Sequence, residues 1–443
     1  MRPDHSGSPA RGGVRELLGR RDYRRLFLGQ AASGLGDWMA TVGLIVLVLK
    51  LTGSSVAVGG VLVLRLLPSL VAAPLAARAA TRLGRRRSML GMDVIRSLCA
   101  VALPLWGTLG WIYGWAFAIE VAGLVFLPAR DASIPALIGE HGDDRRLSLA
   151  NALMVGASYG MIPVGAAAFM LVYWGVGQAG LGGPSLAPFV AVFWIDALTF
   201  LVSFAAIRRI AAGHTEDPGA AEQKAAGVWA GLRIPLVRAV LPALMCVTVG
   251  VGALFSAGVA YVQKVIGASP AVFGALIALF GVGACAALAI RPLTGRLSAL
   301  TRVRVGAVAL GLVMGVMGLL AVTALALLGA FLYGAAATVT LVAAMSLMQE
   351  RLRGTERSLG FVAVHVSSRI GLSVAALAMG AVADLAPSLE IPLAGRLSSV
   401  QLVLAAAGSL VVLGGLIAHD SSAIAPRAQV DDRRRAGARS AGR

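Results

Sequence analysis

The most regular feature of the sequence is an alternation of long apolar stretches with short polar ones. A helix needs about 20 apolar residues to cross the hydrocarbon core of a bilayer. Stretches of this kind occur at roughly 26–49, 56–77, 89–109, 111–128, 149–172, 188–207, 238–262, 271–290, 305–321, 323–345, 358–383 and 398–418. The pattern therefore predicts an all-α membrane protein with twelve transmembrane helices.

The polar stretches differ strongly in positive charge. The one between the second and third spans, "LAARAATRLGRRRSML" at 75–90, holds five arginines. Lys and Arg concentrate in cytoplasmic loops because their translocation is unfavourable. If both termini are cytoplasmic, 33 of the 39 Lys and Arg lie inside, and only Lys50, Lys264 and Arg396 lie in outside loops. We therefore expect a multi-pass protein of the cell (inner or plasma) membrane with both termini cytoplasmic.

Composition agrees with a membrane protein. Of 443 residues, 58% are apolar and 14% are charged, and the mean hydropathy is +0.82. The 55 glycines suit helices that pack closely in lipid. The net charge of +18 follows from the loop arginines, so nucleic acid is not an expected partner. Cys99, Cys246 and Cys285 all fall in apolar stretches and are interpreted as small core residues.

The longest interior polar stretch divides the predicted spans into two groups of six. We expect a cytoplasmic N-tail at 1–25, six-helix bundles at 26–207 and 238–419, a central cytoplasmic loop at 208–237, and a disordered cytoplasmic C-tail at 420–443. The halves resemble each other weakly, since three pairs are offset by 211 positions: Arg146 and Arg357, Ala152 and Ala363, and Gly160 and Gly371. Two pseudo-symmetric bundles indicate a transporter whose halves move about a site at mid-membrane.

Particular residues extend this inference to a family. The first third of the chain contains Gly36–Asp37, "LTGS" at 51–54, Arg65 with Pro68, the basic loop, and Asp93 with Arg96. The segments "LPARDASIPALIGEHGDDRRLSLANAL" and "MQERLRGTERSLGFV" follow later. These features resemble major facilitator superfamily transporters, and most closely the drug:proton antiporter branch with macrolide efflux pumps and the enterobactin exporter. The resemblance implies twelve helices in two bundles and export of small amphipathic molecules.

The resemblance also implies a cytoplasmic gate near the basic loop, formed by Arg82, Arg85, Asp93 and Arg96. Two departures from the family pattern affect this inference. Ala77 and Thr81 stand where the family's loop usually carries glycine and aspartate. In the fifth span, Pro163 is present, but most of the glycines that exporters carry after it are not, which weakens the specific inference of proton antiport.

Six ionisable residues within the predicted spans are candidates for the substrate and proton pathway. An ionisable group at membrane depth is costly and usually faces a cavity or a partner. The candidates are Asp37, Arg65, Glu120, Asp196, His365 and Arg369. Each has an alternative structural interpretation, as an ion pair or hydrogen bond between helices. His365, Arg369 and Ser373 share one helical face.

The sequence contains no Walker-type phosphate loop and no His/Cys cluster with metal-ligand spacing. We therefore expect no enzyme, no metal and no cofactor. The hypothesis that fits best is a monomeric secondary active exporter whose partners are a small-molecule substrate, protons and membrane lipid. An importer or uniporter of a small metabolite and a non-transporting scaffold or sensor remain alternatives.

Overall fold

The computed structural model describes residues 9–71, 83–138, 144–179, 186–211, 224–289, 297–352, 354–391 and 395–417. The N-terminal half comprises α1 (Pro9–Gly19), α2 (Arg21–Thr52), α3 (Ser55–Val71), α5 (Arg85–Ala102), a 3-10 turn (Leu103–Leu105), α6 (Leu109–Ile138), α7 (Asp144–Tyr159), α8 (Ile162–Gln178) and α9 (Ala187–Arg208). The C-terminal half comprises α10 (Lys224–Leu232), α11 (Pro235–Ala260), a π-helical turn (Tyr261–Val265), α12 (Pro270–Ala289), α14 (Ala299–Leu319), α15 (Thr323–Arg351), α16 (Gly354–Leu385), β1 (Leu389–Ile391), β2 (Gly395–Leu397) and α17 (Ser399–Ile417).

The all-α membrane fold is confirmed. Eleven of the described helices, taking adjoining segments as one span, are long and apolar enough to cross a membrane. The second predicted span corresponds to α3, which is described from Ser55 to Val71 and leads into residues outside the described ranges. The predicted disordered tail at 420–443 also lies outside the described residues. One addition to the expected helices is a small antiparallel hairpin, β1–β2, which pairs Leu389 with Leu397.

The fifth span is broken into α7 and α8 by a turn at Gly160 and Met161. Pro163 lies in the first turn of α8 and lacks the N–H that a continuous helix would bond to the backbone oxygen of Tyr159. The α7 side of the break is closed by a hydrogen bond from the Gly160 N–H to the Gly156 oxygen (2.8 Å). The break therefore divides the span into two segments with separate hydrogen-bond ladders.

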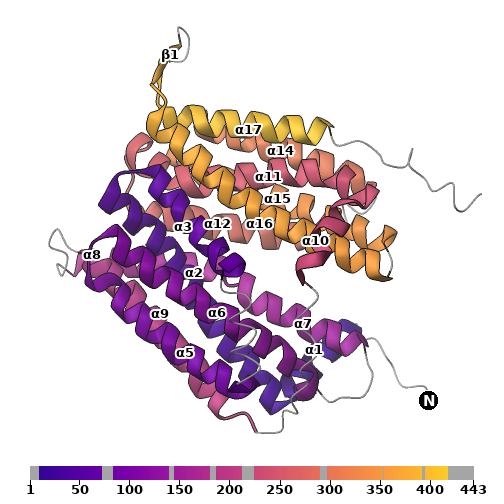
Figure 1. The fold of residues 1–443 in the computed structure, drawn as a ribbon. Coiled ribbons are helices and arrows are strands. Elements are labelled where there is room, and N and C mark those ends of the chain that lie inside the picture. The colour runs from indigo at the N-terminus through magenta and orange to yellow at the C-terminus, as the bar shows by residue number, and fades with distance from the viewer. Residues whose placement is uncertain are drawn as a thin grey trace, which may run out of the picture.

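The two halves lie side by side, and Figure 1 shows the indigo-to-magenta helices of the first half below the orange-to-yellow helices of the second. Each half packs mainly within itself: α2 against α9 in the first, and α14 against α17 in the second. The halves join mainly through two pairs of helices, α3 with α16 and α8 with α12; less extensively, α11 also contacts α2 and α3, and α12 contacts α2. α1 and the end of α17 lie on one side of the molecule, and the β1–β2 hairpin lies on the other.

Candidate transport pathway

One face of α16 contacts α3 along part of its length. This α16 face consists of His365, Arg369, Ser373, Ala376, Gly380 and Asp384, which recur every three or four residues. Ser373 donates a hydrogen bond to the Leu62 backbone oxygen of α3 (3.2 Å). A Cβ added at Gly59 of α3 would lie 2.6 Å from the Ala376 backbone oxygen. The two backbones are therefore in close contact from Asp384 down to Ser373.

The α16 face is exposed to solvent nearer the start of the helix. Arg369 and His365 continue the same face one and two turns before Ser373, and both residues are exposed, whereas Ser373 is buried. The face points toward α3 at Ser373, whereas its side chains one and two turns earlier are exposed. Arg65 lies in α3 about one turn beyond Leu62, near the level of Arg369, but its side chain lies outside the described part of the structure.

The second contact between the halves joins α8 and α12. A Cβ added at Gly274 would lie 3.0 Å from the Ala166 backbone oxygen, and one added at Gly281 would lie 2.6 Å from Pro163. Glycine at these two positions permits this approach because it has no side chain. Pro163 follows the break in the fifth span, so α8 is packed against the C-terminal half while α7 packs against α1, α2 and α6.

Asp196 of α9 lies against α2 at Gly36, the residue before Asp37. Gly36 makes this possible, since a Cβ there would lie 2.4 Å from Asp196 Oδ1 and 2.1 Å from Thr199 Oγ1. Asp196 is buried, and the half-buried Asp37 accepts a hydrogen bond from Ser33 Oγ (3.3 Å). Two of the predicted pathway acids therefore lie on adjacent helices of the same half.

Asp93 and Arg96 form an ion pair within α5. The guanidinium of Arg96 lies between two aromatic rings, 4.2 Å from the Phe126 centroid and 4.5 Å from that of Phe200. Arg85 begins α5, about 12 Å along the helix from Asp93, too far for an ion pair at that position. Arg82 lies outside the described residues. The predicted gate residues therefore separate into a buried pair and an arginine two turns away.

Glu120 lies half-buried in α6. Ala116 and Gly123 share its helical face, and a Cβ added at Gly123 would meet no atom within 4 Å. Glu120 is thus carried on a face bordered by open space. It is not among the residues at the α2–α9 interface.

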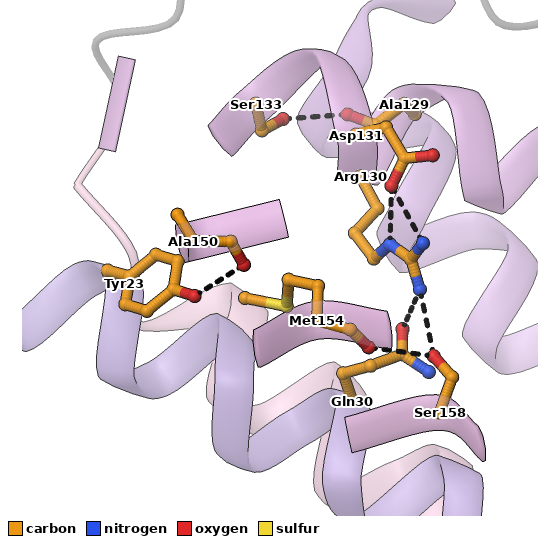
Figure 2. A network of polar contacts seen from close by, with 9 residues as sticks. All are labelled: Tyr23, Gln30, Ala129, Arg130, Asp131, Ser133, Ala150, Met154 and Ser158. Carbon is orange, nitrogen blue, oxygen red and sulfur yellow. Dashed lines mark hydrogen bonds and ion pairs between the residues drawn. The ribbon is translucent and has the colours of Figure 1, made fainter. Parts of the chain in front are cut away.

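A polar network around Arg130 was not predicted from the sequence (Figure 2). Arg130 is 7% exposed. It donates from Nη1 to Gln30 Oε1 (2.8 Å) and Ser158 Oγ (3.3 Å), and from Nε and Nη2 to Asp131 Oδ1 (2.9 and 2.7 Å). Trp38 Nε1 donates to the Ser158 backbone oxygen (3.0 Å). The network joins α2, α6 and α7 two residues before the break in the fifth span.

Arg130 was missed because the sequence pattern ended the fourth span at 128, which placed Arg130 and Asp131 in a loop. In the structure α6 continues to Ile138 with Pro128 inside it. A clue was present in α2, where Gln30 recurs with Ser33 and Asp37 at helical spacing on an otherwise apolar helix. A polar face on one helix implies polar partners on its neighbours.

Comparisons with known proteins agree with this architecture. No curated protein matches the chain in sequence. Among solved structures, the nucleoside transporter NupG matches with a TM-score of 0.69 at 10% identity, over 90% of this chain and 98% of that one. A bacterial homologue of the human lysosomal transporter Spinster matches with a TM-score of 0.66 at 14% identity, over 93% and 97%. A bacterial homologue of the iron transporter ferroportin matches with a TM-score of 0.64 at 12% identity, over 90% and 98%.

These likenesses concern the fold. The family is shown by the sequence itself, because the profile described as "Major Facilitator Superfamily" matches residues 26–376. That family, together with the paired bundles and their two contacts, indicates a transporter of small molecules rather than an enzyme. The chain therefore belongs to the major facilitator superfamily.

Proposed function

We propose that this transporter is a secondary active exporter of small amphipathic molecules, such as drugs, natural products or siderophores, driven by inward movement of protons. The observation that carries the proposal is the position of ionisable groups in both halves. Asp196 lies against Gly36, the residue before Asp37, at the α2–α9 interface, and His365 and Arg369 are exposed on α16 beyond its contact with α3. The sequence resemblance to macrolide efflux pumps and the enterobactin exporter supports this direction of transport.

In this proposal the protein is a monomer in the cell membrane with both termini in the cytoplasm. Arg25 and Arg86 support the orientation, because they lie at the same end of the N-terminal half, where they donate to the backbone oxygens of Arg209 and Arg208 (2.6 and 2.7 Å). Cationic loops favour the cytoplasm. The described conformation is then closed toward the outside, and His365 and Arg369 face the cytoplasmic approach.

The proposal assigns distinct tasks to the charged groups. Asp37, Asp196 and Glu120 are the candidates for carrying the proton, because a carboxyl group at membrane depth can be neutralised reversibly. His365, Arg369 and Arg65 contact the substrate as it enters between the halves. Arg82 and Arg85 belong to the cytoplasmic gate, whereas Asp93 and Arg96 hold α5 against its neighbours.

Transport by purified protein in liposomes tests these assignments. Counterflow of labelled substrate establishes transport, and an imposed pH gradient then measures coupling. Asp37→Asn, Asp196→Asn and Glu120→Gln are each expected to retain counterflow, and the variant that removes the proton carrier loses uphill export. Glu350→Gln is the matched control, since Glu350 is exposed near the end of α15. Uphill export retained in all three variants would rule out these carriers, and absence of counterflow in the unaltered protein would favour the scaffold alternative.

The fifth span favours a second candidate, an importer or uniporter. Ala166 and Ala167 occupy positions where exporters of the superfamily commonly carry a glycine pair. Structures of similar fold include the nucleoside transporter NupG. Substrate flux that reaches equilibrium without responding to an imposed pH gradient would support uniport and exclude proton-driven export.

A further inference from the structure

We propose that Asp384 is a latch between the two halves at the end of the molecule where the β1–β2 hairpin lies. The latch holds this end closed and sets how often it opens. Asp384 lies at the last turn of α16 in the C-terminal half. Its carboxylate accepts hydrogen bonds from Ser54 Oγ (2.6 Å), the Ser55 N–H (2.9 Å) and the Val56 N–H (3.0 Å). All three donors lie at the start of α3, in the other half.

The chemistry of a helix start explains why this contact is strong. The first N–H groups of a helix have no partner within the helix, and they carry its positive dipole end. A carboxylate satisfies both needs and is commonly supplied by the residue just before the helix. Here Ser54, the residue just before α3, accepts from the Ala57 N–H (3.2 Å). The Ser55 and Val56 N–H groups are capped instead by a residue about 330 positions away in sequence. The N–H groups of Ser55 and Val56 must therefore lose this partner when α16 and α3 separate.

A second contact holds the same turn. Lys264, in the π-helical turn after α11, donates from Nζ to the Gly53 backbone oxygen (2.7 Å). Gly53 ends α2 with a positive φ of 64°. The C-terminal half therefore contacts the turn between α2 and α3 at two successive points, with Lys264 at Gly53 and Asp384 at the start of α3. Ser399 Oγ donates to the Ala383 oxygen (2.6 Å), which ties the last turn of α16 to the start of α17.

The latch is accessible to solvent. Asp384 is exposed, and it lines a cavity of about 570 Å³ together with Ser54, Lys264 and Ser398. The contacts beneath it are of another kind: Gly380 lies against the Ser55 backbone, and Gly59 against Ala376. These are dispersion contacts between backbones, which separate without leaving charge unpaired. Asp384, together with Lys264, thus supplies the charged, directional part of the closure.

The proposal rests on alternation between the two halves and is independent of transport direction and of the coupling ion. Opening at this end exchanges three protein hydrogen bonds of a carboxylate for hydrogen bonds to water. Hydrogen bonds to a charged group contribute more than neutral ones, so loss of one or two of them shifts the closed-to-open equilibrium by about tenfold or more. Asp384→Asn keeps the shape of the side chain but leaves only one of its two oxygens to accept hydrogen bonds.

Cysteine labelling tests the latch without substrate or gradient. The reporter is Leu62→Cys in a background with Cys99, Cys246 and Cys285 replaced by alanine, because Leu62 is buried beneath the contact. A membrane-impermeant maleimide is applied from the side opposite the termini, using right-side-out or inside-out vesicles. We expect Asp384→Asn to raise the labelling rate about tenfold, and Ser54→Ala and Lys264→Met to raise it less. Glu350→Gln, near the other end of the molecule, is expected to leave it unchanged.

The outcomes separate this proposal from the proposed function. Ser54→Ala removes the hydroxyl that donates to Asp384 and that also accepts from the Ala57 N–H, so it weakens the latch from the α3 side and tests it even if Asp384→Asn folds poorly in size-exclusion chromatography. Labelling rates that stay at the parental value in both variants would overturn the latch, whatever the transport assays give. Faster labelling would establish it, even in a protein whose transport proves to be uniport.

Discussion

Arg96 pairs with Asp93 one turn away on α5, and the pair is buried among helices of the N-terminal half. Two phenyl rings from α6 and α9 enclose the guanidinium. In the lipid environment each of the two charges depends on the other for compensation, so the pair contributes to stability as one unit. This arrangement leads to a prediction about stability rather than about gating.

Arg96→Met should destabilise the protein strongly. Removing one partner of a buried ion pair leaves an uncompensated charge, which costs about 3–5 kcal/mol. The double variant Asp93→Asn with Arg96→Met should be considerably more stable than Arg96→Met alone, because no charge is then left unpaired. Thermal unfolding of the purified variants in one detergent measures both effects, and equal melting temperatures for the single and double variants would contradict the prediction.

Arg130→Met should loosen α7 from α2 and α6. The change removes the donor to Ser158 of α7 and to Gln30 of α2, and a hydrogen bond from a charged group contributes about 1.5–3 kcal/mol. Arg130→Lys should recover only part of the stability, since an ammonium cannot reproduce the guanidinium fork. The measurement is limited proteolysis near the break at Gly160 together with the melting temperature. Protection and melting equal to those of the parent in Arg130→Met would show that the network is not needed to hold α7.

The extent to which the sequence predicts this structure depends on the range of each interaction. Span lengths follow from hydropathy, a local property, and most predicted spans agree with observed helices within a few residues. The fourth span was predicted too short because Pro128 and two charges resemble a loop, while tertiary partners such as Gln30 keep Arg130 inside α6.

The contacts between the two halves could not be predicted from the hydropathy pattern of the sequence. Asp384 directly follows the span expected at 358–383 and gives no indication of its target, because the start of α3 is brought to it only by the packing of two bundles. His365, Arg369 and Ser373 were correctly placed on one helical face. Only the structure distinguishes Ser373, which contacts Leu62, from the other two, which are exposed.

Gly59→Val should prevent complete closure of α3 on α16. A Cβ at this position would lie 2.6 Å from the Ala376 backbone oxygen, a distance that requires the helices to move apart. The Leu62→Cys reporter should therefore be labelled faster, and transport should fall because one conformation is no longer reached. Gly114→Val is the matched control, since a Cβ at Gly114 meets no atom within 4 Å. Equal labelling rates for Gly59→Val and Gly114→Val would show that the contact between α3 and α16 tolerates the added side chain.

Two buried tyrosines of the C-terminal half give a paired prediction. Tyr261 donates from its hydroxyl to the Met317 backbone oxygen and also contacts that of Leu320, so Tyr261→Phe should cost about 1 kcal/mol. Tyr333 is equally buried, but within the described part of the chain its hydroxyl has no hydrogen-bond partner.

Tyr333→Phe should therefore be neutral or stabilising by about 1 kcal/mol, because it removes a buried polar group that is left unsatisfied. Both substitutions remove the hydroxyl oxygen from an equally buried ring. The stability lost through packing is therefore similar in the two variants and cancels when their melting temperatures are compared. The melting temperature should fall for Tyr261→Phe and stay level or rise for Tyr333→Phe. A clear fall for Tyr333→Phe would mean that its hydroxyl has a partner outside the described residues.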